Sequence, residues 1–139
     1  MSRARGNALQ NALARYLARW WEHAESAGAG RNGSDVLGTP GVVWECKTAF
    51  DFKRDFRPAA WVRQSMEHAH PGRLSPLTCP ASCQVEHPNL PVVVYFPPGV
   101  GEANTANAMA IMPMHLLMHL LEQADYTPEN TSAQKEAQI

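Results

Sequence analysis

The sequence lacks any long apolar run. Hydrophobic side chains make up 45% of its 139 residues, yet no stretch approaches the roughly 20 consecutive apolar residues that a bilayer requires. The charged beginning, MSRARGNALQ, is not followed by the apolar segment of a secretory signal. We therefore expect a cytoplasmic protein with no membrane partner.

Cysteine is also scarce, and positive charge is scarce in the second half. Three cysteines in a cytoplasmic chain predict reduced thiols. Residues 1–73 carry nine Arg and two Lys against seven acids, whereas residues 74–139 carry one Lys against six acids. The asymmetry fits an anionic partner such as nucleic acid, and it equally fits two oppositely charged faces of one domain.

The hydrophobic pattern predicts one domain over residues 1–126 and a disordered polar tail at 127–139. Five prolines mark residues 70–91 as a loop insertion, and there is no internal repeat. Trp20 and Trp21 are expected to pack in the core. Helices are expected at 7–27, at 59–69 and from 113, and strands at 34–37, 41–47, 92–96 and 108–112. This order predicts an α/β fold with a central mixed sheet flanked by helices.

One predicted strand, GVVWECK at residues 41–47, contains charge where burial is expected. Alternate side chains of a strand share a face, so Trp44 and Cys46 face one way while Glu45 and Lys47 face the other. Burying the two charges costs several kcal/mol unless each is paired or binds a metal. The strand therefore predicts either a site or an exposed edge.

Asp35 supplies a second carboxylate, because the flexible turn after it can return the chain beside Glu45. Two adjacent carboxylates repel each other unless a proton or a cation lies between them. Oxygen ligands with open positions suit Mg²⁺ or Mn²⁺, which can activate a phosphodiester for attack by water. Lys47 would orient that water or stabilise developing charge. The alternative is that Asp35 caps a turn while Glu45 and Lys47 form a weak surface ion pair.

The pattern of Asp35, nine residues and then Glu45-Cys46-Lys47 resembles the D…(D/E)XK signature of the restriction-endonuclease-like nuclease superfamily. Over residues 2–124 the segments SRARGNALQNALARYL, GSDVLGTPGVVWECK, AAWVRQ and VVVYFPPG more narrowly resemble actinobacterial and phage Holliday junction resolvases. The resemblance implies a restriction-endonuclease-like core and a metal-dependent endonuclease that resolves four-way DNA junctions as a homodimer. It also implies the bacterial host cytoplasm if a phage encodes the chain.

The resemblance further implies a role for each site residue. Asp35 and Glu45 would bind Mg²⁺ or Mn²⁺ together with the backbone carbonyl of Cys46. Lys47 would be the catalytic lysine, and Gln64 on the next helix would position water or the DNA backbone.

Gln10 departs from the family pattern, because relatives commonly carry a Glu at the aligned position of the first helix. A neutral amide binds a cation less well than a carboxylate. Either Gln10 acts through a water, or the enzyme uses one strong metal site in place of two.

Other basic side chains would contact DNA phosphates without reading sequence. They are Arg3, Arg5, Lys53, Arg54, Arg57 and Arg63. Alternative functions on the same fold are repair, restriction or phage DNA processing. A catalytically weak DNA-binding subunit is an alternative of a different class.

Cys79, Cys83 and His87 give a C-x3-C-x3-H pattern inside the proline-rich loop, with His68 and His70 upstream. Structural zinc uses four such ligands at similar spacing. The alternatives are a disulfide and unligated loop residues.

Overall fold

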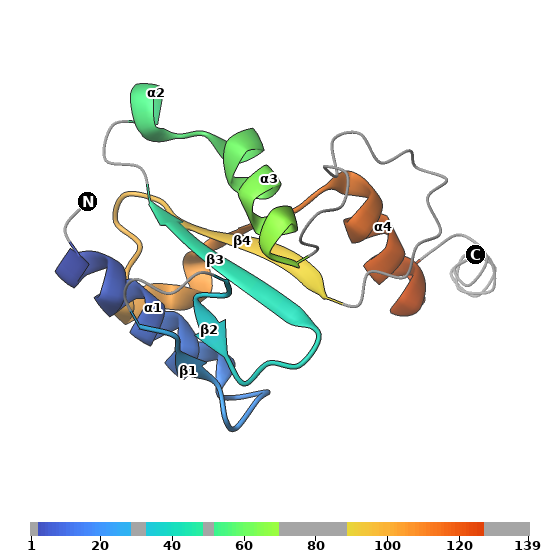
Figure 1. The fold of residues 1–139 in the computed structure, drawn as a ribbon, viewed down its shortest axis with the longest axis horizontal. Coiled ribbons are helices and arrows are strands. Elements are labelled where there is room, and N and C mark those ends of the chain that lie inside the picture. The colour runs from blue at the N-terminus through green and yellow to red at the C-terminus, as the bar shows by residue number, and fades with distance from the viewer. Residues whose placement is uncertain (1–2, 29–32, 49–51, 70–88, 127–139) are drawn as a thin grey trace, which may run out of the picture.

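A mixed three-stranded sheet forms the centre of the protein (Figure 1). The computed structural model describes residues 3–28, 33–48, 52–69 and 89–126. The strands are β3 (Val42–Thr48), β4 (Leu90–Phe96) and β5 (Met109–Ile111). They lie in the order β3-β4-β5, with β3 and β4 parallel and β4 and β5 antiparallel. The prediction of an α/β fold with a mixed sheet is confirmed.

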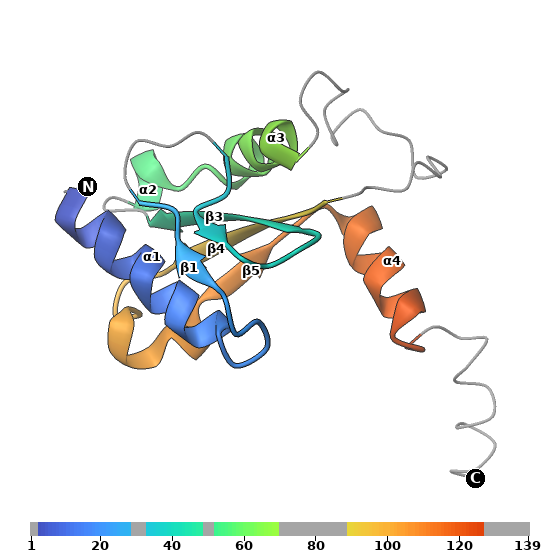
Figure 2. The ribbon, with the colours of Figure 1, turned by 60° about the horizontal axis from the view of Figure 1, so that its bottom comes forward.

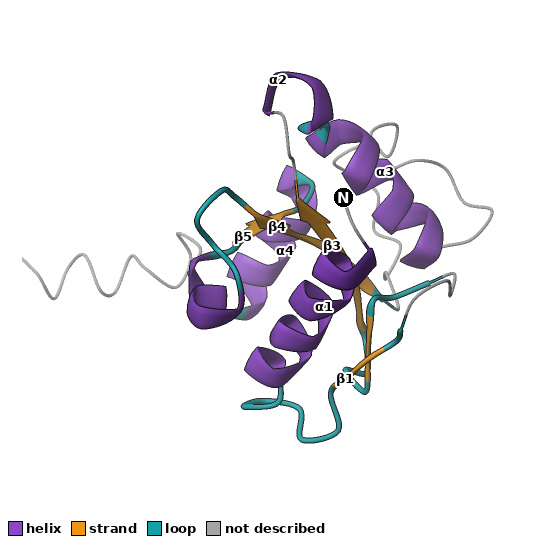
Figure 3. Cartoon of the chain, turned by 90° about the vertical axis from the view of Figure 1, so that its left-hand side faces the viewer, coloured by secondary structure: helices purple, strands orange, loops and turns teal. Residues whose placement is uncertain are grey.

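One helix packs on each face of the sheet, α1 (Arg3–Leu17) on one side and α3 (Pro58–Ala69) on the other (Figure 3). The central strand β4 is buried on both faces, which explains its continuous apolar run. Its alternate residues serve the two faces. Towards α1 the core contains Leu9, Leu13, Leu17, Val92, Val94 and Phe96, and towards α3 it contains Trp61, Val62, Met66, Val93 and Tyr95.

The first helix is shorter than its periodicity predicts. It ends at Leu17, where the amides of Trp20 and Trp21 both donate to the Leu17 carbonyl and turn the chain. Residues after Leu17 were predicted to continue the helix to residue 27. The structure instead places the short strand β1 (Glu25–Ser26) there, and β1 pairs antiparallel with β2 (Val36–Leu37). Trp21 packs edge-on against Trp44 with ring centroids 6.1 Å apart, but Trp20 is 61% exposed, so its predicted place in the core is wrong.

The remaining elements frame this core. They are the short helix α2 (Phe52–Asp55), the 3₁₀ helix η1 (Glu102–Asn107) and α4 (Met114–Gln123). Helix α4 stands apart from the sheet in Figure 2, and its buried Leu116 joins the core on the α3 side. Within the described ranges, no helix has the length and apolar character that crossing a membrane would need.

Two predicted segments fall largely outside the described residues: the polar tail at 127–139 and the proline-rich loop at 70–91. The end of that loop is placed too late by the prediction, because β4 already begins at Leu90. Pro91 pairs with Val43 near the start of β4. Proline is tolerated near the beginning of a strand, where fewer ladder hydrogen bonds depend on it.

Gly38 and Gly41 provide a matched test of the turn that joins β2 to β3. Both have positive φ, at +81° and +84°. A Cβ on Gly38 would lie 2.1 Å from the carbonyl oxygen of His23, whereas a Cβ on Gly41 would meet nothing within 4 Å. Gly41→Ala is expected to lower the free energy of unfolding by about 1–2 kcal/mol through backbone strain alone.

Gly38→Ala must also displace the backbone at His23, and we expect a loss of about 3 kcal/mol. Urea unfolding of the two variants measures the difference. Equal losses would show that the close approach of the Gly38 and His23 backbones is not maintained in solution.

Candidate active site

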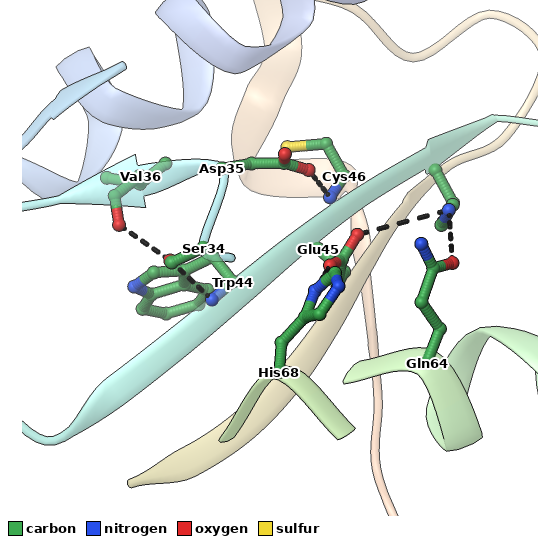
Figure 4. Close-up of polar contacts among 9 residues, drawn as sticks. Ser34, Asp35, Val36, Trp44, Glu45, Cys46, Gln64 and His68 are labelled. Atoms are coloured by element: carbon green, nitrogen blue, oxygen red, sulfur yellow. Dashed lines mark hydrogen bonds and ion pairs between the residues drawn. The ribbon is translucent and has the colours of Figure 1, made fainter. Parts of the chain in front are cut away.

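Asp35 lies at the outer edge of β3, on the side away from β4 (Figure 4). The amide of Trp44 donates to Oγ of Ser34 over 2.9 Å, and the amide of Asp35 donates to the Trp44 carbonyl over 2.8 Å. The amide of Cys46 then donates to Oδ2 of Asp35 over 2.7 Å. Ser34 and Asp35 thus pair with the N–H and C=O of Trp44 and with the N–H of Cys46, and this pairing holds the Asp35 carboxylate at the edge of β3.

The backbone of Cys46 has the orientation that a metal-binding carbonyl at this edge would need. The N–H and the C=O of Trp44 both point to the outer edge, and residues two apart in a strand repeat their orientation. The carbonyl of Cys46 therefore faces the side on which Asp35 lies. Burial raises the pKa of the Cys46 thiol, so the thiol remains protonated at neutral pH and is a poor nucleophile.

Glu45 is buried between β3 and α3, with only 4% of its surface exposed. Its Oε1 contacts Nδ1 of His68, and its Oε2 lies 3.9 Å from Nζ of Lys47. The alternative of an ion pair between Glu45 and Lys47 on an edge strand is right about the strand and the pair, but the pair is not on the surface, because Glu45 is buried.

Lys47 lies one residue pair further along the same face of β3, with 24% of its side chain exposed. Its Nζ donates to Oε1 of Gln64 over 2.9 Å. The predicted proximity of Glu45, Lys47 and Gln64 is thus present, and the amide oxygen of Gln64 holds the ammonium group beside the carboxylate of Glu45.

The two carboxyl groups both resist ionisation. Burial raises the pKa of Asp35 above its ordinary value of 3.8, against the opposing effects of the Cys46 amide and of Lys47. Burial also raises the pKa of Glu45 above 4.5, and the nearby charge of Asp35 raises it further. Lys47 and His68 only partly offset this cost. A cation placed between the two carboxylates would remove the repulsion.

The donor set fits a small hard cation that keeps most of its water. Among the residues described, no group of three or more His, Cys, Asp or Glu side chains could hold a metal ion. Mg²⁺ needs fewer protein ligands, because it is commonly bound through one or two carboxylates with waters and substrate phosphates completing the octahedron. Asp35, Glu45 and the Cys46 carbonyl would be the oxygen donors of such a set.

The side chain of Gln10 contacts β1, and no hydrogen bond joins it to Asp35 or Glu45 among the contacts of the described residues. Its Oε1 accepts a hydrogen bond of 3.4 Å from Oγ of Ser26. Ser26 belongs to β1, whose continuation hydrogen-bonds to Asp35 through the amide of Ala27. Gln10 therefore contacts β1, and the residue after β1 hydrogen-bonds to the backbone of Asp35. This contact gives Gln10 a structural role.

The predicted DNA-contacting residues lie on two elements beside the site and on α1. Lys53, Arg54 and Arg57 are exposed after the end of β3, and Arg63 is exposed on α3 next to Gln64. Arg54 pairs with Asp55 over 3.5 Å, and Nε of Arg57 donates to the Arg54 carbonyl.

The other two predicted contacts, Arg3 and Arg5, belong to the first turn of α1, where the side chain of Arg3 is not described and that of Arg5 is exposed. Cys79, Cys83, His87 and His70, the remaining members of the possible zinc site, lie outside the described residues.

His68 is the site residue that the sequence interpretation placed elsewhere. It was grouped with the possible zinc ligands, but in the structure it contacts the buried carboxylate of Glu45. The sequence does predict that His68 shares a face of the helix with Gln64, because the two are four residues apart. The residue contacted by that face depends on helix packing, which the sequence pattern does not specify.

Comparisons with protein-family models, with curated proteins and with solved structures gave no match to this chain.

Proposed function

We propose that this chain is a metal-dependent endodeoxyribonuclease with a restriction-endonuclease-like core, and that it cuts four-way DNA junctions. The observation that carries the proposal is the buried Glu45, which has Lys47 on the same strand face; burial raises the pKa of Glu45, and the nearby charge of Asp35 raises it further. Two neighbouring carboxylates, one of them buried, repel each other unless a proton or a cation lies between them, and a bound cation would offset this cost. The junction substrate follows from the family resemblance of the sequence.

The roles of the residues follow from their positions. Asp35, Glu45 and the Cys46 carbonyl would hold Mg²⁺ or Mn²⁺, which when bound supplies Lewis-acid activation of the scissile phosphodiester. The ammonium group of Lys47 would orient the attacking water and stabilise the charge that develops on the phosphate. Gln64 keeps that ammonium group in place through its 2.9 Å hydrogen bond.

DNA binding would depend on shape and backbone charge. The exposed Lys53, Arg54, Arg57 and Arg63 lie where phosphates on either side of the cut could be bound. Such binding weakens steeply with salt, because each neutralised phosphate releases counterions. Two symmetric cuts in a junction require two active sites, and we therefore propose a homodimer.

The test compares substrates under one condition. The protein is incubated with Mg²⁺ and labelled four-way junction, linear duplex or single strand of the same sequence, and Glu45→Gln protein purified in parallel controls for contaminating nuclease. We expect cleavage of the junction in a pair of symmetric cuts, abolished by EDTA and absent from the control.

Equal cutting of linear duplex would replace junction resolution by a general role in DNA repair, restriction or phage DNA processing. Binding of the junction without cleavage would favour a catalytically weak DNA-binding subunit. Equal activity of the Glu45→Gln protein would refute the assignment of the site.

A further inference from the structure

Two side chains of α3 hold the two charged side chains of β3. Gln64 contacts Lys47 and His68 contacts Glu45, so the helix runs antiparallel to the strand. The spacing matches on both sides: four residues of an α-helix advance about 6.0 Å, and two residues of a strand advance about 6.6 Å. One helical turn therefore aligns a separate partner with each catalytic group.

The contact with His68 uses one oxygen of Glu45 and leaves the other in the site. Nδ1 of His68 meets Oε1, while Oε2 faces Nζ of Lys47 at 3.9 Å. The terminal torsion of a glutamate is broad and roughly two-fold, so an unheld carboxylate rotates readily. The contact of the ring with Oε1 and the ion pair of Lys47 with Oε2 together restrict this rotation and keep Oε2 on the side of Lys47.

We propose that His68 is a positioning residue for metal binding, which acts through Glu45 and rests on the nuclease function proposed above. It holds the carboxylate in the orientation in which Oε2 binds the cation. Hydrogen-bond partners of metal ligands typically change metal affinity 10- to 100-fold when they are removed.

A purely electrostatic role for His68 predicts the opposite effect. A positively charged ring beside Glu45 would compete with the cation, and its removal would then leave metal affinity unchanged or increase it. Metal affinity therefore distinguishes orientation of the carboxylate from neutralisation of its charge. It also does so without a cleavage assay.

The experiment titrates the full chain with Mn²⁺ and measures free Mn²⁺ by electron paramagnetic resonance. His68→Ala is expected to raise the Kd for Mn²⁺ at least about 10-fold. His68→Asn should recover most of the affinity, because its amide nitrogen occupies the branch position of Nδ1. His68→Gln should not recover the affinity, because its amide nitrogen lies one bond further from the backbone than Nδ1 of histidine. Glu67→Gln, at the exposed neighbouring position of α3, is the matched control and should behave as wild type.

An unchanged or lower Kd in His68→Ala would overturn the proposal, as would an Asn variant as weak as the Gln variant. If His68→Ala does not fold, the comparison between Asn and Gln decides the question alone. The Mn²⁺ affinity of Glu45→Gln distinguishes a wrong role for His68 from a wrong proposed function. Wild-type binding that Glu45→Gln abolishes and His68→Ala preserves overturns only the role of His68. Absence of Mn²⁺ binding by the wild type overturns both.

Discussion

Lys47→Met should lower the single-turnover rate of DNA cleavage about a thousand-fold, the usual scale for loss of a group that stabilises transition-state charge or assists proton transfer. The methionine side chain keeps most of the apolar stem that lies along β3, so the change is confined to the ammonium group. That group lies 2.9 Å from Oε1 of Gln64 and 3.9 Å from Oε2 of Glu45. The rate is measured at saturating protein and Mg²⁺, which separates chemistry from binding.

Lys53→Met is the matched control for this experiment. It removes the same charge from the exposed side of α2, close to the end of β3. We expect weaker DNA binding and a shallower dependence on salt, with an unchanged rate once DNA is saturated. A normal rate in Lys47→Met at saturating Mg²⁺ would exclude Lys47 from the chemical step. Weaker DNA binding with an unchanged saturated rate in both variants would show that Lys47 only contacts DNA.

Strand periodicity was sufficient to predict the division of β3 into two faces. Trp44 and Cys46 pack against the core on the α1 side, while Glu45 and Lys47 contact residues of α3, as alternation requires. The apolar run at 92–96 likewise predicted a strand, which the structure shows as β4. These features depend on neighbouring residues in the chain, and the hydrophobic pattern records such local relations directly.

The position of Asp35 was predicted only in outline. A flexible turn and a spacing of ten residues predict that Asp35 returns beside Glu45, and in the structure its carboxylate accepts a hydrogen bond from the amide of Cys46, the residue after Glu45. The hydrogen bond from the Cys46 amide could not be foreseen, because it depends on the register of residues 34–35 along the edge of β3. If residues 34–35 paired one residue further along β3, the sequence would be unchanged but a different amide would face Asp35.

The end of α1 shows a stronger limit of sequence patterns. Apolar spacing continues through Trp20 and Trp21 without a proline or glycine, so local propensity favours a longer helix. The chain nevertheless turns after Leu17, because β1 must return to pair with β2 and Trp21 packs on Trp44. Contact between distant segments overrides propensity here. The role of His68 was missed for the same reason, since it arises from the packing of α3 on β3.

Asp35→Asn is expected to abolish cleavage and, in the metal-free protein, to increase stability. The substitution keeps an oxygen that can accept the hydrogen bond from the Cys46 amide and removes only the charge. Without that charge a cation would lose one of its two carboxylate ligands. If this raises the activation free energy by about 4 kcal/mol, the rate falls about a thousand-fold. Relief of the repulsion with Glu45 should raise the free energy of unfolding at pH 7.5, because the charge of Asp35 opposes ionisation of Glu45 in the folded protein.

The pH dependence of stability gives the sign of this effect. Both carboxyl groups have a higher pKa in the folded than in the unfolded protein, so the folded state retains protons that the unfolded state has released. Stability from this pair is complete below the ordinary values of 3.8 and 4.5, and is lost as pH rises through the raised values of the folded state. The metal-free wild type should therefore lose more stability than Asp35→Asn across this range.

Urea unfolding in EDTA between pH 3.5 and 8 measures this difference, with Glu102→Gln as the control for removal of an exposed carboxylate. Mg²⁺ added at pH 7.5 should restore stability to the wild type and leave Asp35→Asn unchanged, because a ligand stabilises only the state that binds it. An Asp35→Asn protein less stable than wild type at every pH would identify Asp35 as a structural cap of the β3 edge. In that case the charge of Asp35 contributes to the fold, and the two carboxylates need no cation to coexist.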